Sequence, residues 1–302
     1  MPEEEAKTRE VGAREVNTDK APSIDSVAFA DLLHMEPHGP DTFVALAPRY
    51  PWGRLFGGQV VAQALRAAQL TVPAGFRCHS LHSYFIRGGT HAEPVRFEVD
   101  RIRNGRSFAT RRVVARQSNG AIFNMSCSFH VGEESPDVQA VDAPSNVPDP
   151  ADLVNTGWGA MLDRRAVNTT FGRLTMWIRL VDTLDPTNQA INDCGLAFIS
   201  DSVPTGAVRA THPHQVANRE ESHRVFSGAS LDHSIYFHRT VNPSQWLLAD
   251  VVCHSIVAAR GLTVGNLFDQ SGVHVATIVQ EALLRERRSE SGGVDGLAGK
   301  VV

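Results

Sequence analysis

The chain has 302 residues, of which 42% are hydrophobic and 21% charged, and its formal net charge is −4. This length and apolar content suit two domains of ordinary size, each with its own core. The near-balanced charge, with no basic stretch interleaved with aromatic residues, argues against a nucleic-acid partner. No apolar run reaches the roughly 18–20 residues that a membrane span needs, and the polar N-terminus does not resemble a signal peptide.

Cysteine usage favours a reducing compartment. The four cysteines are scattered without CxxC spacing. We therefore expect reduced thiols, mostly small core residues, in a cytoplasmic protein. The C-terminal sequence KVV does not form a peroxisomal address.

Composition divides the chain into five segments. Residues 1–23 and 287–302 are polar and lack apolar periodicity, which predicts disorder at both ends. Residues 133–165 form the predicted linker, because their first part, EESPDVQAVDAPSNVPDPAD, has four prolines, many acids and few apolar residues. The linker separates an N-terminal domain, residues 24–132, from a C-terminal domain, residues 166–286.

The N-terminal domain is predicted to contain one long helix followed by an antiparallel meander. The sequence FGGQ leads into VVAQALRAAQL, whose apolar residues fall on one wide helical face. Runs with strand character follow: HSLHSYFIR, VRFEVDRIR, SFATRRVVARQ and AIFNMSCSFHV. Asn104-Gly105 and Asn119-Gly120 are hairpin turn signals.

The C-terminal domain repeats this order. MWIRLV predicts a strand and TNQAINDCGLAFISDSV a helix, and four strand-like runs follow: SLDHSIYFHRTV, WLLADVVCHSIVAARG, LTVGNLFDQ and VHVATIVQEALL. Eight positions separate Gly120 from Ser128, and eight separate Gly272 from Gln280, so Gln280 takes the place of Ser128. A period of about 150 residues indicates duplicated domains.

One long helix against a strongly curved antiparallel sheet is the hot-dog fold. The predicted class is therefore α+β, with two hot-dog domains in tandem. Two such units can pair their sheets and so cover each other's edges.

Several sequence blocks resemble the type II acyl-CoA thioesterase family. FGGQVVAQAL, HSLHSYFIRGG and NGRSFATRRVVARQ resemble its first half, and LDHSIYFHR, WLL, ARGL and VQEALLR resemble its second half. The resemblance covers roughly residues 26–286. It implies an enzyme that hydrolyses fatty acyl-CoA to free fatty acid and CoA, without a cofactor.

The resemblance also implies the catalytic residues. In that family an Asp from the LDHS block, a Thr or Ser after WLL and a Gln from VQE bind and orient a water molecule. The Asp matches Asp232 and the Gln matches Gln280. Asp232 is the expected general base, and the amide of Gln280 suits the orientation of water.

The hydroxyl residue departs from the family pattern. Counted from Trp246, the usual Thr falls on His254. Ser255 supplies the hydroxyl only after a one-residue shift, which requires a bulge in the strand; alternatively, His254 holds the water itself. This departure motivates a second hypothesis, an acyl-CoA-binding hot-dog protein with little or no turnover.

The first half supplies the candidate substrate contacts. Gly57 and Gly58 precede a helix whose N–H groups could polarise the thioester carbonyl, because glycine lets a ligand approach the backbone. Gln59 and His82 lie in matched blocks and are candidate contacts as well. For His82 structural support is the favoured alternative, and Gln59 could instead cap a sheet edge.

Two other chemistries are not expected. Among the thirteen histidines, His212-Pro213-His214 and His79/His82 are close pairs, but no cluster has convincing ligand spacing, so no metal is predicted. No GxSxG nucleophile elbow is present. A homo-oligomer is possible by analogy with other proteins of this fold.

Overall fold

The computed structural model describes residues 21–216 and 219–287. Most of both segments predicted to be disordered, 1–20 of the first and 288–302 of the second, lies outside the described residues. In the part of the chain that is described, no helix is long and apolar enough to cross a membrane.

The first half contains the predicted helix and meander. Its elements are η2 (Ile24–Ser26), α1 (Phe29–Leu32), β1 (Glu36–Pro37), β2 (Thr42–Ala45), α2 (Gly57–Gln69), β3 (Arg77–Phe85), β4 (Val95–Asn104), β5 (Phe108–Gln117) and β6 (Gly120–His130). The run VVAQALRAAQL forms most of α2, and the four strand-like runs are β3 to β6. Gly120 has φ +110°, which explains why a glycine occupies the turn between β5 and β6.

The second half repeats this order with three additions. Its elements are η3 (Pro150–Asp152), β7 (Leu162–Thr170), β8 (Arg173–Leu180), α3 (Gln189–Ser200), α4 (Pro204–Thr211), α5 (Arg219–Val225), β9 (Phe226–Ser230), β10 (Asp232–Phe237), β11 (Leu247–Val257), β12 (Arg260–Phe268) and β13 (His274–Glu286). The sequence pattern did not predict β7, α4, α5 or β9. The predicted linker, 133–165, contains η3 and the first residues of β7.

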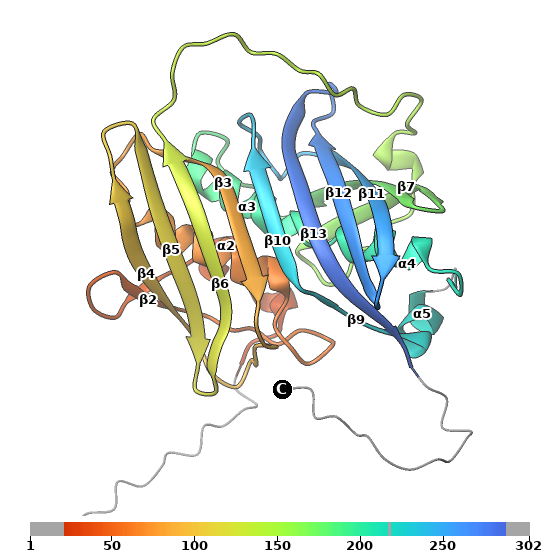
Figure 1. Ribbon diagram of the computed structural model, residues 1–302, viewed down its shortest axis with the longest axis horizontal. Coiled ribbons are helices and arrows are strands. Elements are labelled where there is room, and N and C mark those ends of the chain that lie inside the picture. The colour runs from red at the N-terminus through yellow and green to blue at the C-terminus, as the bar shows by residue number, and fades with distance from the viewer. Residues whose placement is uncertain (1–20, 217–218, 288–302) are drawn as a thin grey trace, which may run out of the picture.

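The strands of both halves form one continuous antiparallel sheet. Its order is β1-β2-β4-β5-β6-β3-β10-β13-β12-β11-β8-β7, and β9 also pairs with β13. The halves join where β3 pairs with β10, at the middle of the sheet (Figure 1). Tyr84 pairs with Asp232 and Ser80 with Tyr236, so a shift of 152 positions maps one strand onto the other. This is the pseudo-twofold arrangement expected of tandem hot-dog domains.

The two long helices lie on one face of this sheet and run antiparallel to each other (Figure 1). The N-terminus of α2 meets the C-terminus of α3, because a Cβ atom on Gly58 would lie 2.3 Å from the carbonyl oxygen of Phe198. At the opposite end, Gln69 Nε2 donates to the carbonyl oxygen of Ala190. The small residues of α2 thus permit the close packing of the two helices.

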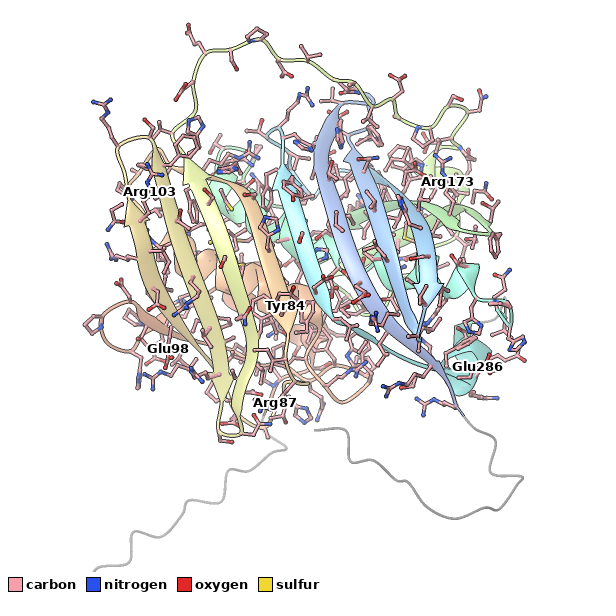
Figure 2. All side chains as sticks on the ribbon, in the orientation of Figure 1. Tyr84, Arg87, Glu98, Arg103, Arg173 and Glu286 are labelled. Atoms are coloured by element: carbon pink, nitrogen blue, oxygen red, sulfur yellow. The ribbon has the colours of Figure 1, made fainter. Side chains whose placement is uncertain are left out.

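The other face of the sheet is solvated. Side chains along β5 and β10 largely alternate between buried and exposed or half-buried positions, as expected where one face packs on the helices. Figure 2 views this outer face, where Tyr84 on β3 is 63% exposed. All four cysteines are buried and unpaired, as the sequence predicted.

We expect Gly58→Ala to destabilise the protein, because the added methyl group has backbone as its nearest neighbour and the helices must separate. Overpacking of this kind costs about 1–3 kcal/mol, which lowers Tm by several degrees. Gly88→Ala is the matched control, because its Cβ would meet only Arg54, at 3.9 Å. Thermal unfolding of both variants measures the difference; equal Tm values would contradict the tight helix contact.

Candidate active site

Gln280 lies on the helix-facing side of the sheet. It is 0% exposed on β13, where it follows the same alternation as Ile278 and Ala282. Its amide Nε2 donates to the Ser230 hydroxyl at 2.8 Å. Ser230 is the last residue of β9, and this short strand pairs with β13 beside Gln280. An amide buried in an apolar strand therefore has a specific hydroxyl partner.

Asp201 completes this group from the helix layer. It caps the C-terminus of α3 and is 6% exposed. The Ser230 hydroxyl donates to Asp201 Oδ1 at 3.1 Å, and the backbone N–H of Gly58 donates to the same carboxylate. A chain of hydrogen bonds thus runs from Gln280 through Ser230 to Asp201, and we refer to these three residues as the acid–hydroxyl–amide group.

Burial governs the charge of this carboxyl group. Removal from water raises the pKa of Asp201 to about 7, and the hydrogen bonds from Ser230, Gly58 and Gln280 oppose the rise. The N-terminus of α2 also favours a negative charge here, because its first N–H groups have no partner within the helix. Asp201 is consequently divided between its acid and its base form near neutral pH.

His233 lies behind the amide of Gln280. It is 0% exposed, and its Nε2 is 2.9 Å from the Ser200 hydroxyl. Burial lowers the pKa of His233 to about 4, and the nearby Gln280 amide opposes this. Gln280 Oε1 and His233 Nδ1 are both buried without a hydrogen bond of normal geometry. A proton on Nδ1 directed at Oε1 would satisfy both atoms and aim the amide N–H groups at Ser230.

The structure does not bring Asp232 and Gln280 together. Because side chains alternate along a strand, Asp232 lies on the outer face opposite to its buried neighbour His233, and it pairs with the exposed Tyr84. Its carboxylate accepts a hydrogen bond from the backbone N–H of Glu281 at 2.6 Å. The Asp232 carboxylate and the Gln280 amide therefore lie on opposite faces of the sheet.

His254 and Ser255 lie further from Gln280. The bulge that the sequence required is present between Cys253 and Ser255, and both His254 and Ser255 are exposed. The strand β12 separates β11 from β13, which places two strand spacings, roughly 10 Å, between them and Gln280. The hydroxyl group in contact with the Gln280 amide is that of Ser230.

The predicted substrate residues divide into two groups. Gly57 and Gly58 are at the acid–hydroxyl–amide group, since a Cβ on Gly57 would lie 2.6 Å from Asp201 Oδ2. Gln59 is buried elsewhere, where its Nε2 donates to the carbonyl oxygen of Leu46. His82 is on the outer face of β3, with its Nδ1 3.1 Å from the Ser234 hydroxyl.

An aromatic cluster borders the acid–hydroxyl–amide group. Phe56 caps the N-terminus of α2, and its ring centroid lies 5.1 Å from that of Phe198 in the last turn of α3. Trp158 packs edge-on against Phe56 at 4.8 Å and against Trp52 at 4.8 Å. Trp52 is 41% exposed, so this apolar wall reaches from the buried carboxylate to solvent.

A cavity of about 430 Å³ lies at the opposite end of the helix pair. Its walls come from the C-terminus of α2 and the N-terminus of α3, with Leu33, Arg66, Leu184 and Ile191 among the lining residues. None of the acid–hydroxyl–amide group lines it. Hydrogen bonding and burial, rather than cavity size, therefore identify the candidate site.

Sequence reasoning missed Asp201 and Ser230. Asp201 ends the predicted helix in the run AFISD, where an aspartate resembles an ordinary capping residue. Ser230 stands two positions before Asp232, inside a block that had been singled out for its aspartate. The available signal was polarity in an apolar setting, which had already distinguished Gln280.

Comparisons with known proteins agree with this architecture. The models of the acyl-CoA thioesterase N-terminal and C-terminal domains match residues 46–130 and 133–284. Acyl-coenzyme A thioesterase 8 of Homo sapiens is 30% identical over 86% of this chain and 89% of its own length. The structure of an acyl-CoA thioesterase II from Mycobacterium marinum has 32% identity and a TM-score of 0.75, covering 86% of this chain and 99% of that one.

The fold extends to more distant proteins. A hot-dog protein of unknown function from Alicyclobacillus acidocaldarius has a TM-score of 0.69 at 20% identity, covering 86% of this chain and 98% of that one. This likeness concerns the fold alone, and it confirms the predicted tandem hot-dog architecture.

We expect Asp201→Asn to stabilise the protein at pH 8. The folded pKa of about 7 exceeds the ordinary 3.8, so the folded state binds more protons between these values and stability falls as pH rises through that window. Asparagine removes the buried charge, and Tm at pH 8 should rise by a few degrees, with little gain at pH 4. Asp142→Asn, at an exposed position, is the control. If the Tm gain of Asp201→Asn over the wild type were the same at pH 4 and pH 8, the raised pKa of Asp201 would be contradicted.

Proposed function

This chain belongs to the acyl-CoA thioesterase family, and we propose that it hydrolyses acyl-CoA to free acid and CoA by direct attack of water. The resemblance predicted from sequence blocks is confirmed by the two domain models, which together match most of the chain. The observation that carries the proposed mechanism is the hydrogen-bonded chain from Gln280 through Ser230 to Asp201.

In this proposal Asp201 is the general base. A carboxyl group with a pKa of about 7 is well matched to proton transfer near neutral pH. It removes a proton from water while the water oxygen attacks the thioester carbon. The tetrahedral intermediate then expels the CoA thiolate, which recovers a proton from the Asp201 carboxylic acid.

Ser230 and Gln280 position the water. The hydroxyl both donates and accepts, and the amide has a second N–H beyond the one given to Ser230. Together with the carboxylate they define three directions from which a water molecule can be held. No covalent intermediate is required.

The N-terminus of α2 is the proposed site for the developing negative charge. Its first N–H groups have no acceptor within the helix, and that of Gly58 already donates to the Asp201 carboxylate beside which the thioester would lie. Donors of this kind act on the carbonyl oxygen without reorganisation.

The aromatic cluster is the proposed wall for the acyl group. Trp52, Phe56 and Trp158 give a continuous apolar surface that ends at the acid–hydroxyl–amide group. An acyl chain that packs on these rings would leave the CoA portion on the solvent side.

A non-hydrolysing acyl-CoA-binding protein is not favoured. That hypothesis depended on the loss of the family hydroxyl at His254. Ser230 supplies a hydroxyl in contact with both Asp201 and Gln280, so the reason for expecting low turnover disappears.

Two further expectations belong to this proposal. A cytoplasmic location follows from the four reduced cysteines, and a homo-oligomer follows from analogy with other hot-dog proteins. Cell fractionation and sedimentation velocity test them independently of activity.

The first test compares two aspartates. We expect Asp201→Asn to lower kcat/KM by about 10²–10⁴-fold, the usual contribution of a general base, and Asp232→Asn, on the outer face, to change it by less than about threefold. Release of the CoA thiol from short-, medium- and long-chain acyl-CoAs measures both. A large loss in Asp232→Asn with activity retained in Asp201→Asn would restore the pairing predicted from sequence.

The pH dependence provides a second test. Because the base form of Asp201 is required, log kcat/KM should rise with unit slope below pH 7 and level off above about 7. Thiol release measured between pH 5 and 9 gives the profile. A rate that is constant through pH 7, or that falls as pH rises, would exclude Asp201 as the base.

A further inference from the structure

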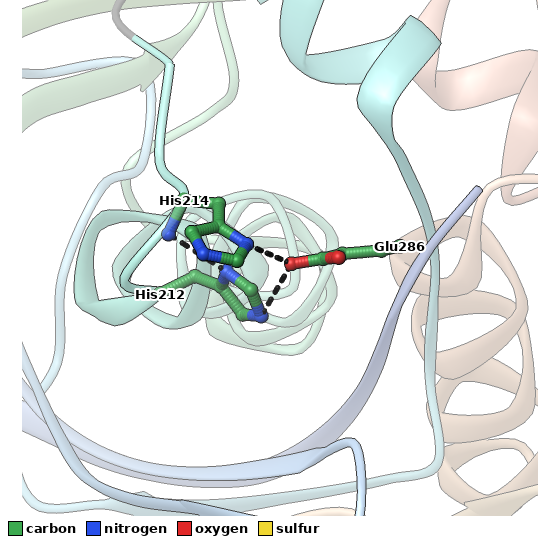
Figure 3. A group of neighbouring side chains, drawn as sticks. All are labelled: His212, His214 and Glu286. Atoms are coloured by element: carbon green, nitrogen blue, oxygen red, sulfur yellow. Dashed lines mark hydrogen bonds and ion pairs between the residues drawn. The ribbon is translucent and has the colours of Figure 1, made fainter. Parts of the chain in front are cut away.

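Two histidines and a glutamate from distant parts of the chain meet at the surface (Figure 3). His212 caps the C-terminus of α4, His214 lies two positions after it, and Glu286 is the last residue of β13. One ligand atom of each lies within 4.8 Å of the others. We propose that His212, His214 and Glu286 form a binding site for Zn²⁺.

The donor set suits zinc. Imidazole nitrogen and carboxylate oxygen are both ordinary zinc ligands, and three protein ligands leave a fourth position for water. His212 Nε2 lies 3.7 Å and His214 Nδ1 2.5 Å from Glu286 Oε1. Ligands of a tetrahedral zinc ion are separated by about 3.3 Å when each is about 2.0 Å from the metal. The two separations lie on either side of this value, so ion binding requires the ligand atoms to adjust.

The fold holds two of the three ligands in place. The His212 ring packs edge-on against Phe226 at 4.8 Å, and its side chain is only 16% exposed. Glu286 pairs with Phe226 in the sheet, so both ligands are anchored around the same residue. His214 is 72% exposed and can adjust to the ion.

Zinc binding at His212 Nε2 requires the loss of one hydrogen bond, which the His212 ring accepts at Nδ1. The backbone N–H of His214 donates to Nδ1 of His212 at 3.2 Å, which keeps the proton of a neutral ring on Nε2. Zinc bound at Nε2 requires that proton on Nδ1. The hydrogen bond that is lost is long, at 3.2 Å. The ion–ligand bonds take the place of the contacts that both histidines make with Glu286.

This site is separate from the proposed active site. Glu286 is six positions beyond Gln280 on β13, about 20 Å along the strand. A metal ion here would connect the end of β13 to α4, which packs on β11, β12 and β13. We therefore expect zinc to affect stability rather than turnover.

The test uses untagged full-length protein. Calorimetric titration with Zn²⁺ should give one ion per chain with micromolar or tighter affinity, and zinc should raise Tm, because a ligand that binds only the folded state stabilises it. Co²⁺ as a second probe should give the visible absorption of a tetrahedral site. His214→Ala and Glu286→Gln should weaken zinc binding at least about tenfold and abolish the Tm increase.

The control is His38→Ala, at an exposed histidine outside the cluster, which should bind zinc as the wild type does. His212 is not varied, because its ring is part of the packing around Phe226. Absence of zinc binding at about 100 µM metal would overturn the proposal. Wild-type affinity in both His214→Ala and Glu286→Gln would overturn it as well, because the ion would then bind elsewhere.

Discussion

The antiparallel contact of α2 with α3 is the constraint on which the proposed chemistry depends. It places the carboxylate that ends α3 against the first turn of α2, and glycines at that turn allow the approach. Burial there raises the pKa of Asp201 to about 7, while N–H groups and the Ser230 hydroxyl keep the charged form accessible. Without this contact Asp201 would be an ordinary surface carboxylate, fully charged at neutral pH and a weak base.

The two ends of the α2–α3 helix pair, which the duplication relates to each other, carry different polar residues. The start of α3 lies 132 positions after that of α2, so Gln69 corresponds to Asp201. The strands of the two halves are offset by 152 positions, so Cys78 corresponds to Ser230 and Ser128 to Gln280. The first-half set has neither a carboxylate nor the same hydrogen bonds. Gln69 instead donates to Ala190 and accepts from the Cys194 thiol. Each chain therefore has one acid–hydroxyl–amide group, at one end of its helix pair.

The sequence predicts the architecture better than the chemistry. Apolar periodicity and turn residues suffice to predict α2, α3 and most strands, because each depends on neighbours along the chain. Gln280 is also predictable, since an amide in an apolar strand needs a partner. The outward position of Asp232 is not predictable from composition, because the strand register shifts by one residue at Leu231, between β9 and β10. The meeting of His214 with Glu286, 72 positions apart, likewise depends on the tertiary fold.

The pairing of β3 with β10 has a consequence for how activity arises during synthesis. The carboxyl, hydroxyl and amide groups all come from the second half, but the helix that buries the carboxyl group comes from the first. The partners Ser83 and His233 are 150 positions apart, so this central pair closes only after most of the chain has left the ribosome, and contacts of such separation form slowly. Until β3 and β10 pair, α2 does not cover Asp201, and the carboxyl group keeps the low pKa of an exposed aspartate. Completion of the fold is therefore the step that assembles the proposed active site.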